Sequence, residues 1–160
     1  MILAGALLLS PTGIAAEIDA SGEPSGGTHA LTSGFSPEQV RFDVPSGGEH
    51  LASELTAENE TPCAGGWLGS APSARFEFEQ PTDRPLIFFV DTPDSDPTLA
   101  IRAPDGSWHC NDDWHSLMPR IFFADPAEGS YDVFVGSYTE GSTPSVTLVV
   151  TETERATAQH

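Results

Sequence analysis

Apolar and polar side chains alternate over short segments along most of the chain, as they do in β-strands that bury one face. The clearest segments are residues 39–44, 73–79, 130–136 and 145–151. Residues 85–91 form instead a continuous apolar run, which predicts a strand covered on both faces. Strong helical periodicity is absent, so the pattern predicts an all-β protein.

Turn-forming residues separate these segments. The chain contains 15 Gly and 14 Pro, and Pro104-Asp105-Gly106 is placed to close a hairpin between residues 98–103 and 107–110. Residues 51–55 fit either a short strand or a helical turn. Roughly seven to nine short strands of this spacing predict an antiparallel β-sandwich with a jelly-roll-like arrangement.

The composition of the two ends suggests how the chain is divided. Residues 1–16 are apolar and then end in the small pair Ala15-Ala16, which predicts a signal peptide and export to the periplasm or the medium. The positive start of such a peptide is missing, so either the true start lies upstream or the signal is atypical. We expect a flexible lead-in over 17–27, a single domain over 28–152, a polar tail over 153–160, and no membrane span in the mature form.

The charge narrows the classes of partner. The chain has 24 acidic residues and six basic ones, all Arg, for a net charge of −18. This balance argues against nucleic acid and against anionic lipid, because both need clustered basic side chains. It is compatible with a solvated acidic surface suited to a salty medium, and also with cation binding.

Two cysteines, Cys63 and Cys110, are present. In an exported protein the simplest interpretation is one disulfide bond, and the alternative is a pair of free thiols. A bond closing a loop of about 48 residues is expected to stabilise the fold by roughly 4 kcal/mol.

The second half of the chain carries a recognisable series of motifs. These are Asp96–Ile101, Pro104-Asp105-Gly106, Asn111-Asp112-Asp113 and Gly129–Val135. Their order and spacing over residues 85–151 resemble the bacterial pre-peptidase C-terminal domain family. The resemblance implies a jelly-roll-like β-sandwich that often binds calcium and sometimes a polymeric substrate. This chain departs from the family in having no protease domain and in placing a cysteine directly before the Asn-Asp-Asp loop.

Oxygen-bearing side chains gather at the two open ends of the expected hairpin. Asn111, Asp112 and Asp113 follow its second strand, Asp96 precedes its first strand, and Asp91 begins the preceding turn. Calcium takes six to eight oxygen ligands of this kind. The alternative is that these residues are turn formers whose side chains bond to nearby backbone N–H groups.

Aromatic side chains near this loop are candidate ligand contacts. The disulfide would bring Trp67 close to the acidic loop, which itself contains Trp114. Aromatic faces beside carboxylates are typical of sugar-binding sites, but the same residues could equally cover a small core. Phe134 is out of phase with Val133 and Val135, so it either packs in a second layer or is an exposed contact residue.

Two histidines, His109 and His115, flank the acidic loop. They could bind a transition metal, or they are simply exposed loop residues. The sequence contains no nucleophile elbow, no zinc-protease motif and no phosphate-binding loop.

These observations predict an exported, non-catalytic binding or accessory module with a calcium site at one end of the sandwich. Its partner would be a polysaccharide or another exported protein. The alternative function is calcium-dependent surface attachment or self-association through an exposed Phe134, and a small secreted hydrolase is a further hypothesis. The sequence does not predict the oligomeric state.

Overall fold

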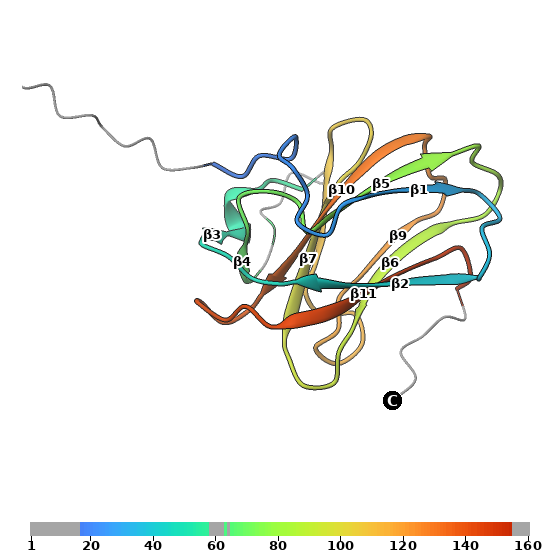
Figure 1. The fold of residues 1–160 in the computed structure, drawn as a ribbon. Coiled ribbons are helices and arrows are strands. Elements are labelled where there is room, and N and C mark those ends of the chain that lie inside the picture. Colours follow the sequence, from blue (N-terminus) through green and yellow to red (C-terminus); the bar gives the residue numbers. More distant parts are fainter. Residues whose placement is uncertain (1–16, 58–62, 64, 155–160) are drawn as a thin grey trace, which may run out of the picture.

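The structure is a computed structural model that describes residues 17–57, 63 and 65–154. The predicted signal peptide and residues 155–160 of the predicted tail lie outside the described residues. Within the described ranges the chain forms eleven β-strands and a single 3₁₀ turn, without an α-helix. The strands lie in two packed layers (Figure 1), which confirms the prediction of an all-β sandwich. There are more strands than predicted because two-residue strands also pair.

The larger sheet is built around β10 (Gly129–Ser137), which pairs antiparallel with β5, β7 and β4. Its other members continue outward from these neighbours. They are β1 (Thr28–Thr32), β3 (His50–Leu51), β4 (Trp67–Leu68), β5 (Ala74–Glu79), β7 (Pro97–Arg102) and β8 (Trp108–Asn111). The pair β1–β5 is parallel, whereas the other pairs are antiparallel.

The smaller sheet has four strands in the order β2–β11–β6–β9. Their bounds are β2 (Gln39–Pro45), β11 (Ser145–Thr151), β6 (Leu86–Asp91) and β9 (Arg120–Phe123). The long strands coincide with the segments that alternation predicted. The predicted hairpin is present as β7 and β8, with Gly106 in the left-handed conformation (φ 87°) that its turn requires.

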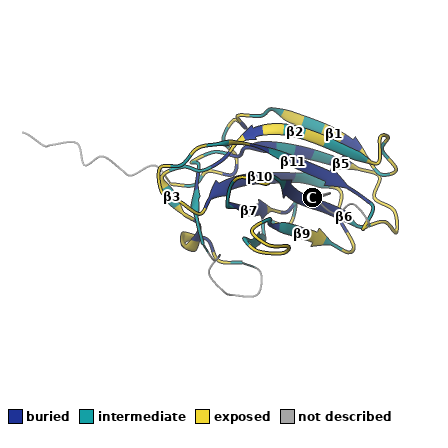
Figure 2. Ribbon diagram, turned by 90° about the horizontal axis from the view of Figure 1, so that it is seen from below, coloured by how far each residue is buried: buried dark blue, intermediate teal, exposed yellow. Residues whose placement is uncertain are grey.

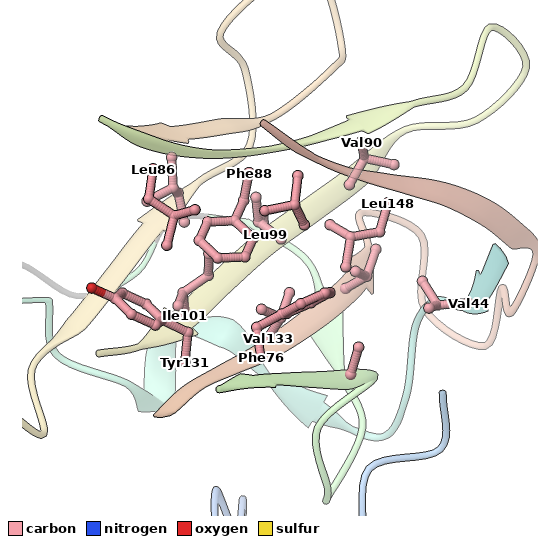
Figure 3. Close-up of a cluster of buried hydrophobic side chains, with 14 of the residues drawn as sticks. Val44, Phe76, Leu86, Phe88, Val90, Leu99, Ile101, Tyr131, Val133 and Leu148 are labelled. Carbon is pink, nitrogen blue, oxygen red and sulfur yellow. The ribbon is translucent and has the colours of Figure 1, made fainter. Parts of the chain in front are cut away.

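The main core lies between the two sheets (Figure 3). Phe76, Phe88 and Leu148 are fully buried there, together with Tyr131, whose hydroxyl donates a hydrogen bond to the Ala127 carbonyl at 2.8 Å. The hydroxyl lies at the edge of the core, so it is paired although the ring is buried. Burial raises the pKa of Tyr131 to about 12.

The outer faces of both sheets also carry buried apolar side chains. On the larger sheet Phe134 has 1% exposure and packs with Leu68 and Ala100, while Val133 and Val135 point into the main core. Phe134 therefore packs in a second layer, and the prediction that it contacts a ligand is wrong. The residues that complete this second layer are Ala20, Ala52, Leu55 and Cys63.

Residues 17–27, predicted to be a flexible lead-in, instead pack against the larger sheet. The Asp19 N–H donates to the Ser70 carbonyl at 2.7 Å, and Arg75 Nη2 donates to the Ala20 carbonyl at 2.7 Å. Ala20 is buried, so this polar segment gains apolar contacts that its composition did not indicate. The segment is part of the folded domain.

The disulfide Cys63–Cys110 is present, as predicted. It joins β8 to the chain after residues 51–55, which form the end of β3 and the 3₁₀ turn Ala52–Glu54. Figure 2 shows that buried residues dominate the central strands, whereas β9 carries exposed positions. The described residues contain no helix that is long and apolar enough to cross a membrane.

Candidate functional site

The β7–β8 hairpin places the acidic loop beside Asp96. Asn111 pairs with Leu99 in the register of the two strands, so Asp112 and Asp113 follow β8 at the level where Asp96 leads into β7. Short antiparallel hairpins bring their open ends together in this way. The loops before β7 and after β8 therefore meet at one end of the sandwich (Figure 1).

The three carboxylates at this end repel one another. The pKa of Asp96 is raised above its ordinary value, first by partial burial and then by the negative charges of Asp113 and Asp112. The structure thus brings together three of the five predicted calcium ligands, Asp96, Asp112 and Asp113. Asp96 is repelled there by the other two carboxylates.

Two residues that the sequence analysis did not single out complete this corner. Gly65 has a positive φ of 64°, and a Cβ at this position would lie 2.7 Å from Asp112 Oδ2 and 3.1 Å from the Tyr138 ring. The Tyr138 N–H donates to the Asp96 carbonyl at 2.8 Å, and its side chain is 55% exposed. The only sequence signal for Gly65 is its place in a Gly-Gly pair near Cys63.

Two other predicted ligands are engaged elsewhere. Asn111 Oδ1 accepts a hydrogen bond from the Arg120 N–H at 2.9 Å, and Asp91 forms an ion pair with Arg41 of β2. Over residues 17–57, 63 and 65–154, no group of three or more His, Cys, Asp and Glu side chains is arranged to hold a metal ion. The carboxylates approach each other without forming a finished metal cage.

The histidines that flank the loop lie apart from each other. His109 Nε2 is 3.1 Å from Ser107 Oγ, and its ring lies 4.7 Å from that of Phe123. His115 lies in the β8–β9 loop, with its ring 6.0 Å from that of Trp114. The two imidazoles thus have different neighbours.

Of the candidate aromatic contacts, Trp114 is exposed and Trp67 is half-buried. Trp67 lies in β4, where it pairs with Leu51 and Ser137. Trp114 is 44% exposed, and the guanidinium carbon of Arg120 lies 4.4 Å from its ring centroid. The same guanidinium lies 5.4 Å from the ring of Phe122, which is 42% exposed. Arg120 and Phe122 share a face because they are two residues apart on β9, but the approach of Trp114 to them depends on the path of the β8–β9 loop, which no local pattern predicts.

Two hollows border the β8–β9 loop. One, of about 260 Å³, lies between that loop and the β6–β7 turn and is lined by Pro93, Ser95, Leu117 and Met118 among others. The other, of about 220 Å³, lies between the edge strands β8 and β9. Both are small for enclosing a drug-sized molecule, so this end of the protein offers surface contacts instead of a deep cleft.

No family model matches the chain, and no curated protein matches it.

Proposed function

We propose that the protein is an exported, non-catalytic binding module in which a calcium ion joins the loops that carry Asp96 and Asp112-Asp113. The observation that carries this proposal is that the hairpin brings Asp96 close to Asp112 and Asp113, where partial burial and then the repulsion from these two carboxylates raise the pKa of Asp96. A divalent cation between the two loops would convert that repulsion into attraction. The resemblance to pre-peptidase C-terminal domains points the same way.

The ion would be structural. Asp112 and Asp113 begin the loop that carries Trp114, so fixing these carboxylates would also fix the exposed indole next to β9. Because the described residues do not form a ready-made cage, binding must draw the two loops closer, which costs free energy. We therefore expect an affinity of about 10⁻⁴–10⁻³ M, the range of extracellular calcium modules.

Export and the non-catalytic role belong to the same proposal. The disulfide supports an oxidising compartment, because such bonds persist mainly outside the cytosol. Self-association through calcium stays a second hypothesis, but it can no longer rest on Phe134, which is buried.

Thermal unfolding with EDTA and with 10 mM calcium tests the proposal. At that excess over the expected dissociation constant, calcium should raise Tm by roughly 3–8 °C. Asp96→Asn should remove most of the increase. Asp83→Asn is the matched control, because it deletes one exposed carboxylate from the loop that joins β5 and β6.

An unchanged Tm for the wild type at 10 mM calcium would show that the site assignment is wrong. Magnesium at the same concentration serves as the ion control, since its small octahedral shell suits loosely arranged carboxylates poorly. Sedimentation of the same samples separates the two hypotheses: a monomer with a raised Tm supports the module, and a calcium-dependent oligomer supports self-association.

A further inference from the structure

The outer face of the four-stranded sheet carries a second surface feature, built on β9. Arg120 pairs in register with Phe89, and Phe122 pairs with Ile87, so all four side chains project from the same face. Phe89 and Ile87 belong to a small buried cluster with Val149, separate from the main core. Arg120 and Phe122 thus stand at the margin of an apolar platform.

Arg120 lies close to two exposed aromatic rings. Its guanidinium carbon lies 4.4 Å from the Trp114 ring centroid and 5.4 Å from that of Phe122. Cation–π contacts of this kind orient the planar guanidinium. The two rings come from different elements, β9 and the β8–β9 loop, so two apolar rings lie beside one positive charge.

The charge of Arg120 has no carboxylate partner in the part of the chain that the structure describes. Three other arginines there do: Arg41, Arg75 and Arg84 pair with Asp91, Asp132 and Glu152. In addition, Arg120 Nε is buried and has no hydrogen-bond partner. Leaving a buried donor unpaired costs free energy. In a chain with 24 acidic residues, this arginine is suited to a carboxylate that comes from outside.

The hollow of about 220 Å³ beside Arg120 supplies further donors. It is lined by Asn111, His109, Trp108 and Phe122 as well as Arg120. Because Asn111 Oδ1 already accepts the Arg120 backbone N–H, its amide NH₂ is the group left to donate. The surface therefore combines hydrogen-bond donors with flat apolar rings, and it favours a ligand rich in oxygen acceptors that also has apolar C–H faces.

We propose that the Trp114–Arg120–Phe122 surface binds a uronic-acid polysaccharide, with one sugar carboxylate on Arg120 and pyranose faces on the flanking rings. This inference rests on the proposed role as a binding module and names its ligand class. An acidic peptide is the competing ligand. An extended peptide would bind β9 by adding a strand, and the outward N–H of Arg120 is already bonded to Asn111, which disfavours that mode.

Isothermal titration calorimetry of the full chain tests the proposal. The probes are oligogalacturonate and oligoalginate, the methyl ester of the galacturonate, and poly-glutamate. The titrations are run in EDTA and repeated with 10 mM calcium, because the proposed ion would also fix the loop that carries Trp114. Salt at 150 mM screens the repulsion between the acidic protein and the acidic polymer beyond about 8 Å. We expect binding of at least one uronate and at least tenfold weaker binding of the methyl ester.

Variants locate the surface. Arg120→Gln should weaken uronate binding at least tenfold, and Arg120→Lys should weaken it less, because it keeps the charge and loses the planar fork. Arg102→Gln is the matched control, since Arg102 is an exposed arginine of β7. Trp114→Ala should also weaken binding, with Leu51→Ala as the control for a large exposed apolar side chain. A thermal melt of each variant verifies that it is folded.

Four outcomes would overturn the proposal: no binding of either uronate, equal binding of the methyl ester, tighter binding of poly-glutamate, or equal losses in Arg120→Gln and Arg102→Gln. None of these would touch the calcium proposal, which is measured by melting without glycan. Conversely, if calcium does not change the Tm of the wild type, the calcium proposal is wrong, and the glycan proposal is still tested by calorimetry.

Discussion

Arg75 Nε donates a hydrogen bond to Asp132 Oδ1 at 2.5 Å, between residues that lie directly opposite each other on β5 and β10. The same guanidinium donates to the carbonyls of Ala20 and Gly22. Arg75 thus connects the centre of the larger sheet to the N-terminal segment, and it explains why a polar stretch packs against the domain.

Removing the carboxylate of this pair should be costly. The side chains of Arg75 and Asp132 are only 18% and 9% exposed, so Asp132→Asn leaves a poorly compensated buried charge. We expect a loss of about 3 kcal/mol in the free energy of unfolding, measured by urea denaturation. Asp91→Asn, which breaks the pair with the more exposed Arg41, should cost less than about 1 kcal/mol. Equal losses would contradict the role given to Arg75.

The raised pKa of Asp96, which burial and then the charges of Asp113 and Asp112 cause, predicts a specific dependence on pH. Because the pKa of Asp96 is raised in the folded state, its ionised form opposes folding at pH above that pKa, and the penalty disappears as the pH falls through it. In EDTA, Asp96→Asn should therefore raise Tm at pH 7 by about 1–3 °C and by less at pH 4. A gain that persists unchanged at pH 4 would show that charge repulsion is not its cause.

The second layer on the larger sheet should contribute as much to stability as a main-core position. Phe134 is buried at 1% exposure, so Phe134→Ala should cost about 3–5 kcal/mol. Phe122→Ala, at 42% exposure, should change the free energy of unfolding by about 0.5 kcal/mol or less. Chemical denaturation of both variants provides the comparison, and a small loss for Phe134→Ala would mean that the outer layer is weakly packed.

The disulfide should be a major source of stability. Cys63 and Cys110 are 47 residues apart in the sequence, and replacing both by alanine should cost roughly 4 kcal/mol in the chain-entropy model. The measurement is urea denaturation of the double variant against the wild type. Reducing agent added to the wild type should give a similar loss, whereas the double variant should not respond to it.

Alternation predicted the long strands because every second residue is apolar and faces the main core, as in Gln39–Pro45 and Ser145–Thr151. Alternation did not predict which residues are buried by a segment that is distant in the sequence. Phe134 is covered on the outer face by Ala20 and Leu55, among others, and no local pattern shows such a layer. The approach of Asp96 to Asp112 could be predicted because one short hairpin controls it.

The surface around Arg120 could not be predicted in the same way. It depends on the pairing of β9 with β6, which sets the face of Arg120 and Phe122, and on the path of the loop that carries Trp114. Neither is encoded in a local spacing. The ion pair between Asp91 and Arg41 could not be predicted for the same reason. These residues meet only when β2 and β6 both pair with β11.

The hydrogen bond from the Arg120 N–H to Asn111 has a consequence for behaviour at high concentration. In the described structure β8 pairs only with β7 and β9 pairs only with β6, so both are edge strands. Exposed edges are templates on which chains add strands to one another and aggregate. Here the two edge strands lie on either side of the hollow between β8 and β9, and the Asn111 side chain already accepts a hydrogen bond from the Arg120 N–H. This side of the sandwich is therefore guarded against intermolecular strand addition by its own geometry.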